Sequence, residues 1–168
     1  MENISTSNNQ KILKNFLIVV LGSILLTVSA KIKIPFYPVP MTMQTFVVLF
    51  LGISFGYKIA VATVFVYLVE GLLGLPVFSN SPEKGVGLAY FVGPTMGYLI
   101  GFLFAAFFAG YLNFKTNLIL IFIKLLFSVF FIYFFGIVWL GILIGWEKPI
   151  FKLGFFPFIY AELFKILL

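Results

Sequence analysis

The sequence predicts an all-α membrane protein that crosses the bilayer several times. Hydrophobic residues make up 62% of its 168 residues and charged residues only 10%, a balance that excludes an ordinary water-soluble globule. A helix needs roughly 20 mostly apolar residues to cross the bilayer core, and several uncharged stretches reach that length. The uncharged stretches are 15–30, 34–57, 85–114 and 125–146. The length is that of one domain, so residues 1–168 are expected to form a single transmembrane domain.

Helix-breaking residues divide the chain into six expected helices. Prolines within 31–43 lack a backbone N–H and disfavour helical geometry in the preceding residue. That segment is therefore a surface loop or a lid over a cavity, and its apolar side chains favour the lid. Turn sequences at 56–58, 74–76 and 113–117 separate further helices. The expected helices are 11–30, 42–55, 59–73, 88–112, 118–144 and 156–168.

The sixth expected helix is shorter than a membrane span. Counted from Pro157 it holds 12 residues, about 18 Å at helical rise. We therefore expect either that the chain is truncated or that this helix enters the membrane only part way. At the other end, the polar N-terminus and the lack of a small-residue cleavage site predict no cleaved signal peptide.

The charges of the chain point to the lipid bilayer as its surroundings. The net charge of +6 comes from lysine alone, because the chain has no arginine. A basic balance in so apolar a chain is typical of a membrane surface and is not evidence for nucleic-acid binding. The lysines are spread over loops on both expected sides, so the usual positive-inside count does not fix the orientation.

Several kinds of chemistry are excluded by composition. Cysteine, histidine and aspartate are all absent, which removes disulfides, the usual metal sites and histidine-based catalysis. The chain also has no G-x-x-x-x-G-K-[ST] loop for ATP. We therefore expect no metal, no cofactor and no enzyme activity, and any ATP hydrolysis would come from a separate protein.

Small residues mark surfaces where helices can approach closely. They recur every four residues along the expected helix 88–112, which places them on one face. Such a stripe favours close helix packing in lipid. Its members are Gly93, Gly97, Gly101, Ala105 and Ala109. Ser23 and Thr27 share a face of the first helix, and they indicate either internal packing or a docking face for a partner subunit.

Polar residues among the expected helices are the candidates for ligand binding, because such groups are costly in a bilayer. Glu162 and Lys165 are three residues apart and share a helical face. They form either a salt bridge at an exposed chain end or a donor and acceptor pair that faces a cavity. Gln44 follows the proline-rich segment, and its amide both donates and accepts. The expected ligand-binding residues are Glu162, Lys165, Asn80, Gln44, Tyr90 and Gly93.

Three motifs in order resemble one known family. PVPMTMQTF (Pro38–Phe46) resembles the P-V-P-x-T-x-Q signature of BioY, the biotin-capturing membrane subunit of energy-coupling-factor vitamin transporters. GLPVF from Gly74, followed by GLAYFVGPTMGYLIGF from Gly87, is similar to the second signature of the family. PFIYAELFK (Pro157–Lys165) is similar to the third, P-F-x-P-G-D-x-x-K. The resemblance covers essentially residues 15–168.

The resemblance implies a fold, a function and partners. The fold would be the six-helix bundle of energy-coupling-factor substrate-binding (S) subunits, with a cytoplasmic N-terminus and the first long loop covering a biotin pocket outside. The function would be biotin uptake across the cytoplasmic membrane, together with a transmembrane coupling subunit and a pair of ATPases. Glu162 and Lys165 match the acidic residue and the lysine of the third motif, with glutamate in place of aspartate. Tyr160-Ala161 replaces its Pro-Gly pair, and Met96 replaces a glycine of the second motif.

The expected chemistry at the site follows from the shape of biotin. Its ureido ring needs an acceptor for its N–H groups and a donor for its carbonyl, and we expect Glu162 and Asn80 to supply them. Lys165 would fix the carboxylate of Glu162 or of the ligand. Two alternatives remain open: capture of a different vitamin or small heterocycle, and a membrane scaffold subunit that binds no ligand.

Overall fold

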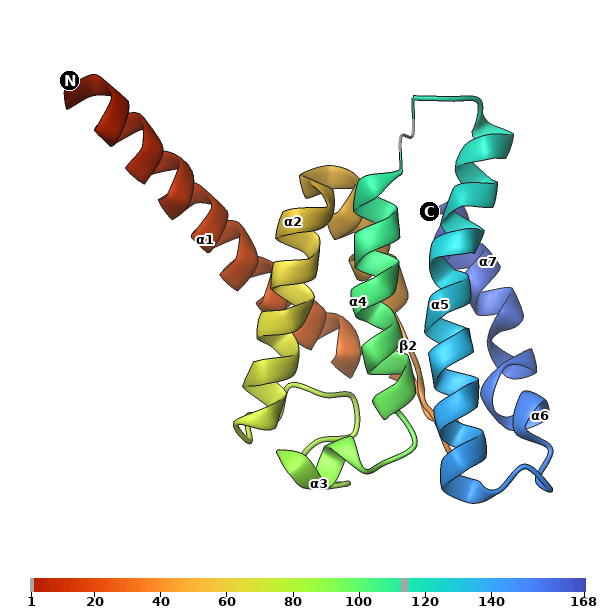
Figure 1. Cartoon of the computed structure of the whole chain (residues 1–168). Coiled ribbons are helices and arrows are strands. Elements are labelled where there is room, and N and C mark those ends of the chain that lie inside the picture. Colours follow the sequence, from red (N-terminus) through yellow and green to blue (C-terminus); the bar gives the residue numbers. More distant parts are fainter. Residues whose placement is uncertain (1, 113–114) are drawn as a thin grey trace.

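The computed structural model describes residues 2–112 and 115–168. Most of the long helices stand side by side, and the first helix runs obliquely, with its N-terminal part away from the others (Figure 1). The helices are α1 (Glu2–Lys31), α2 (Gln44–Leu72), α3 (Leu88–Phe91), α4 (Met96–Tyr111), α5 (Leu118–Ile144), α6 (Ile150–Gly154), the 3-10 helix η1 (Phe156–Phe158) and α7 (Ile159–Leu167). Among the described residues, α2, α5 and the part of α1 from Asn8 are long and apolar enough to cross a membrane. The predicted class, an all-α polytopic membrane protein, is confirmed.

α2 consists of two helical halves that reverse direction at a glycine. Gly56 has φ 77° and ψ 165°, a conformation that residues with a Cβ rarely adopt. Figure 1 shows the two halves running in opposite directions beside α4. The expected turn at 56–58 thus has its counterpart in the structure. With α2 counted as two, the described residues contain six helices of nine residues or more, of which α7 is the shortest.

The proline-rich segment forms a small hairpin where the sequence predicts an irregular loop. β1 (Lys33–Ile34) pairs antiparallel with β2 (Met41–Thr42), with Lys33 opposite Thr42. The prolines lie between the two strands, where no ladder hydrogen bond needs their missing N–H groups. Because 41–42 is taken up by this pairing, α2 begins at Gln44, two residues after 42, the earliest start that the sequence allows for this helix.

The expected helix 88–112 is wrong as a single element. The structure has the short α3, a non-helical connection at 92–95, and then α4. Pro94 explains the interruption, because it lacks an N–H and disfavours helical geometry at Gly93. Gly93 therefore does not belong to the small-residue stripe of α4.

The remaining stripe residues lie where α4 meets its neighbours. A Cβ added to Gly101 would lie 2.5 Å from the Cα of Ile132, and one added to Gly97 would overlap the backbone of α5 at Phe135. Ala109 faces α2: a Cβ added to Gly52 of α2 would lie 2.7 Å from the Cβ of Ala109. The backbones of α4 and α5 thus approach more closely than larger side chains would permit.

Ser23 lies inside the contact between α1 and α2. Its side chain is 1% exposed, and its Oγ donates a hydrogen bond to Glu70 Oε1 at 2.9 Å. Thr27 Oγ1 donates to the backbone oxygen of Ser23 at 3.0 Å. In this arrangement Ser23 serves internal packing and is not accessible to a partner subunit.

The last expected helix, 156–168, is divided in two. The chain after α5 turns at Gly145, forms the five-residue α6, and then runs through η1 into α7. Pro157 lies within η1, where its fixed φ suits the first turn of a helix.

The first helix, α1, also differs from the expectation, because it begins at Glu2 and not at Lys11. Residues 2–10 contain no glycine or proline that would end a helix.

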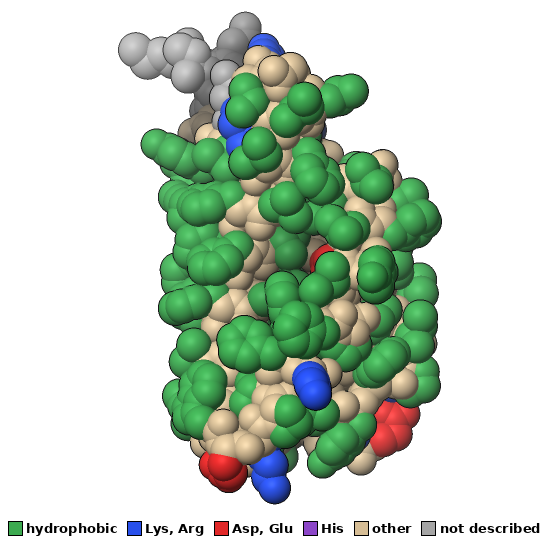
Figure 2. All heavy atoms as spheres, turned by 90° about the vertical axis from the view of Figure 1, so that its right-hand side faces the viewer, with side chains coloured by type: hydrophobic (Ala, Val, Ile, Leu, Met, Phe, Trp, Pro, Cys, Tyr) green, Lys and Arg blue, Asp and Glu red, His purple; other side chains and the backbone are tan. Residues whose placement is uncertain are grey.

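The outer surface has the composition expected of a protein surrounded by lipid. Figure 2 shows the face built by the right-hand elements of Figure 1, and hydrophobic side chains cover its middle. Charged side chains gather mainly toward its two ends. A small red area is visible in a hollow near the middle of this face.

A methyl group at Gly101 tests the close approach of α4 and α5. We expect Gly101→Ala to lower the free energy of unfolding by about 1–3 kcal/mol, because the backbone of α5 must move. Thermal unfolding in detergent, followed by circular dichroism, measures the loss. Gly93→Ala is the control, because its Cβ would meet only Tyr90 O, at 3.1 Å. Equal losses in the two variants would contradict a special role for the contact at Gly101.

Candidate functional site

A pocket lies where segments far apart in the sequence meet. The hairpin loop and the start of α2 line one side, and residues 78–79 and the start of α4 line another. α5, η1 and α7 complete it. Including its mouth, the pocket holds about 510 Å³ of space that no protein atom fills. The pocket thus gathers side chains from both halves of the chain around one hollow.

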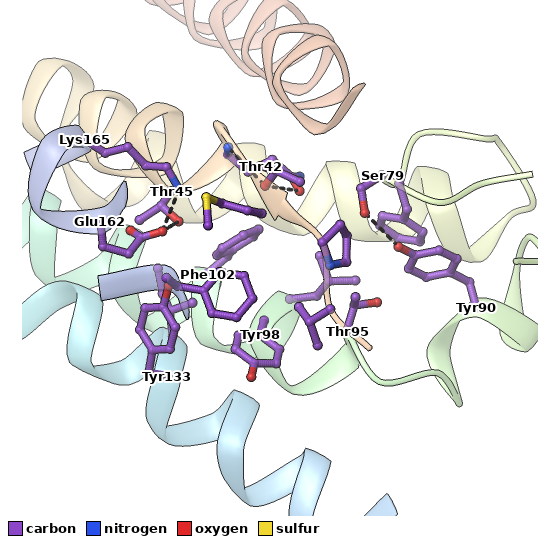
Figure 3. Close-up of a pocket in the computed structure, with 18 residues that line it drawn as sticks. Thr42, Thr45, Ser79, Tyr90, Thr95, Tyr98, Phe102, Tyr133, Glu162 and Lys165 are labelled. Atoms are coloured by element: carbon purple, nitrogen blue, oxygen red, sulfur yellow. Dashed lines mark hydrogen bonds and ion pairs between the residues drawn. The ribbon is translucent and has the colours of Figure 1, made fainter. Parts of the chain in front are cut away.

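Two groups of polar side chains lie at separate ends of the pocket, with further hydroxyl groups between them (Figure 3). Glu162, Lys165 and Thr45 form one group. Ser79 and Tyr90 form the other, and their hydroxyl oxygens are 3.2 Å apart. A ligand that spans the pocket would therefore meet a charged group at one end and two hydroxyl groups at the other.

The charged end is a buried ion pair with one free acceptor. Lys165 Nζ donates to Glu162 Oε1 at 2.6 Å, and Thr45 Oγ1 donates to the same oxygen at 3.3 Å. Glu162 is 6% exposed and Lys165 5%, so the pair is not an exposed salt bridge at the chain end. Glu162 Oε2 is buried and has no partner within hydrogen-bonding geometry among the described residues, although the hydroxyl of Tyr133 lies close to this carboxylate. Leaving a buried acceptor unpaired is costly, so this oxygen is suited to receive a donor from a ligand.

Gln44 lines the pocket but is already held by the protein. Its Nε2 donates to Tyr67 Oη at 2.8 Å, and its Oε1 accepts from Thr42 Oγ1 at 3.3 Å. Tyr67 Oη in turn donates to Val77 O at 3.2 Å. This chain of bonds connects the start of α2 with the loop that follows α2. One N–H of the Gln44 amide remains for a further acceptor.

Aromatic and hydroxyl side chains between the two ends were not among the candidates from the sequence. The lining includes Thr95, Tyr98, Phe102, Tyr133 and Phe158. Aromatic residues make up 20% of the chain, so sequence offers no means of separating those in a pocket from those facing lipid. Thr95 could have been suspected from the sequence, because it follows the helix-breaking pair Gly93-Pro94 and stands just before α4.

Asn80 and Gly93 do not line this pocket, contrary to the expectation. Both lie in a small neighbouring pocket, which shares Tyr90 and Thr95 with the main one. Asn80 Oδ1 accepts from Lys33 Nζ at 3.1 Å. Gly93 O accepts from Trp139 Nε1 at 2.9 Å. The conformation of the loop decides these positions, and turn composition alone does not specify it.

Glu162 also lines a second, apolar hollow between α5 and α7. Of the described residues that line this hollow, Glu162 is the only charged one. Within the described chain no three acidic side chains gather as a metal-ligand cluster. What the arrangement offers is therefore hydrogen bonding and apolar contact, without a metal centre among these residues.

Comparison with known proteins gives the family. A family model described as the BioY family matches residues 2–168. The chain belongs to the BioY family. The resemblance of the three motifs is thus confirmed over nearly the whole sequence.

Individual relatives of the BioY family agree in length as well as in sequence. The probable biotin transporter of Pyrococcus horikoshii is 35% identical over 152 residues, which are 90% of this chain and 89% of the relative. The biotin transporter of Thermotoga maritima is 36% identical over 143 residues, 84% of this chain and 83% of the relative. A crystal structure of the S-component for biotin from an ECF-type ABC transporter superposes with a TM-score of 0.77. It is 28% identical and covers 95% of this chain and 88% of its own.

Removing the positive member of the buried pair tests its energetic role. Lys165→Met is expected to cost about 3 kcal/mol of unfolding free energy, because the carboxylate of Glu162 is left buried without its partner. Glu162→Gln combined with Lys165→Met is expected to cost less than Lys165→Met alone. Chemical unfolding in detergent measures both. Lys152→Met, at an exposed lysine, is the control, and a loss as small as in this control would contradict the buried pair.

Proposed function

We propose that this protein captures biotin as the S subunit of an energy-coupling-factor transporter and so serves biotin uptake. It is a transport protein and not an enzyme. The relatives named as biotin transporters and the superposition on a biotin S-component support this function over most of the chain. The observation that carries the proposal for the site is the pocket with a buried carboxylate whose Oε2 has no partner.

The ureido ring of biotin fits the charged end of the pocket. It has two N–H donors and one carbonyl acceptor in a rigid plane. Glu162 Oε2 accepts one N–H in this proposal. Lys165, whose ammonium group has further N–H donors besides the one on Oε1, donates to the carbonyl. Lys165 thus takes the donor role that the sequence had suggested for Asn80, because Asn80 lies outside this pocket. A carboxylate that gains a donor on binding would relieve the cost of its unpaired oxygen.

The rest of biotin fits the apolar middle and the far end. Phe102, Phe158 and Ile132 offer apolar contact for the sulfur ring and the aliphatic tail. The carboxylate at the end of the tail lies near the hydroxyl groups of Ser79 and Tyr90, which donate hydrogen bonds to anions.

Partner subunits complete the transporter in this proposal. The sequence has no ATP-binding loop, so the energy for uptake comes from other chains. By family resemblance these are a transmembrane coupling subunit and a pair of ATPases. The site of action is the cytoplasmic membrane, which agrees with the apolar helices.

Replacement of Glu162 tests the site. Glu162→Gln is expected to raise the dissociation constant for biotin at least about tenfold, because an amide is a weaker acceptor than a carboxylate. Glu147→Gln, at an exposed glutamate, is expected to leave it unchanged. Isothermal titration calorimetry with the purified protein in detergent measures the binding. Unchanged affinity in Glu162→Gln would remove Glu162 from the site.

The same assay separates the alternative cargoes. Thiamine and riboflavin, in excess, are expected not to displace labelled biotin. If the unmodified protein binds one of them and not biotin, the cargo is a different vitamin. If no vitamin binds or raises the melting temperature, the chain is a scaffold subunit and the proposal is wrong.

A further inference from the structure

Two lysines connect the first loop of the protein with the second. Lys31, the last residue of α1, donates from Nζ to Phe78 O at 2.7 Å and to Ser81 O at 2.8 Å. Lys33, in β1, donates to Ser79 O at 2.6 Å and to Asn80 Oδ1 at 3.1 Å. Four hydrogen bonds from two ammonium groups thus meet one segment, 78–81, which we call the acceptor loop.

These bonds are stronger than ordinary loop contacts. A hydrogen bond with an ionised donor is shorter and about twice as strong as one between neutral groups. Three of the four acceptors are backbone oxygens, so the bonds fix the course of the main chain and not only the side chains. A lysine supplies up to three N–H donors, which lets one side chain bind two neighbouring carbonyls.

The acceptor loop supplies two residues of the pocket. Phe78 is fully buried, and its ring stacks on Tyr90 with a centroid distance of 4.6 Å. It also meets the ring of Tyr67 edge-on at 5.3 Å. Ser79 pairs with the hydroxyl of Tyr90 (Figure 3). The position of the loop backbone therefore decides where the hydroxyl end of the pocket lies.

A third lysine joins the same two loops in the opposite direction. Lys84, which follows the acceptor loop, places its Nζ 5.7 Å from the centre of the Tyr37 ring in the hairpin loop. Val39 and Pro40 of that hairpin loop line the pocket together with Phe78. Cations thus connect, from both sides, the two loops that line one pocket.

We propose that Lys31 and Lys33 are positioning residues for ligand binding, which hold the acceptor loop in place and thereby slow the release of the ligand. This inference rests on the proposed function. Neither lysine lines the pocket, so each acts through Phe78 and Ser79. The alternative is that the two lysines only stabilise the fold, without any effect on the bound molecule.

Dissociation of biotin measures the effect on the ligand. The variants are Lys31→Met, Lys33→Met and the double variant, each as the purified full chain, with labelled biotin displaced by excess unlabelled biotin. We expect each single variant to release biotin about tenfold faster and the double variant faster still, because charged hydrogen bonds are lost. Lys33→Arg keeps the charge and the donors and is expected to restore most of the slow release.

The control separates positioning from general stability. Lys152→Met removes an exposed lysine in α6 and is expected to leave the release rate unchanged. The melting temperature of each ligand-free variant is expected to equal that of Lys152→Met, because a local loop opens without the bundle. Unchanged release in the double variant, or faster release matched by a fall in melting temperature, would overturn the proposal.

Hydrogen exchange makes the test independent of biotin. In the ligand-free protein, amides of the acceptor loop are expected to exchange at least about tenfold faster in the double variant than in Lys152→Met. If the unmodified protein fails to bind biotin, the proposed function is wrong, and this exchange still decides whether the lysines position the loop. Equal exchange in the two variants would show that they do not.

Discussion

The buried pair of Glu162 and Lys165 is the interaction on which the architecture of the pocket depends. Two charges inside an apolar bundle carry a large cost of desolvation, which close pairing only partly offsets. The rest of the bundle keeps the pair in place: α7 carries both residues on one face, and Thr45 of α2 donates to the same carboxylate oxygen. Oε2 of this carboxylate, with the Tyr133 hydroxyl nearby, is the acceptor that a ligand carrying an N–H or O–H can reach from the pocket.

Close helix packing makes room for this site. Gly97 and Gly101 let α4 approach the backbone of α5, and the same two helices contribute Tyr98, Phe102 and Tyr133 to the pocket. Tyr98 Oη donates to Gly154 O at 2.8 Å, which connects α4 with the segment leading into α7. The small-residue stripe and the ligand site are therefore two aspects of one arrangement, in which the glycines determine how far apart the lining residues stand.

Most of the fold can be predicted from the sequence, and four of the six expected ligand-binding residues line the pocket: Glu162, Lys165, Gln44 and Tyr90. Long uncharged stretches predict helices because the bilayer imposes that length, and the spacing of Glu162 and Lys165 predicts a shared face because α-helices repeat every 3.6 residues. Asn80 was misplaced because the path of a turn depends on tertiary contacts such as the bond from Lys33. The break in the expected helix 88–112 could have been predicted, because Pro94 is visible in the sequence and proline interrupts helices. Thr45, Tyr98 and Phe158 were missed because nothing local distinguishes them from their many neighbours of the same type.

Lys31 ends the first transmembrane helix and also holds a loop that lines the pocket, which links binding to the lipid environment. Transmembrane helices adjust their tilt when the thickness of the hydrocarbon layer changes. Because the ammonium group of Lys31 is bonded to the carbonyls of Phe78 and Ser81, a change in the tilt of α1 would pull on both. Vesicles made of lipids with short and long acyl chains are therefore expected to give different affinities for the same vitamin.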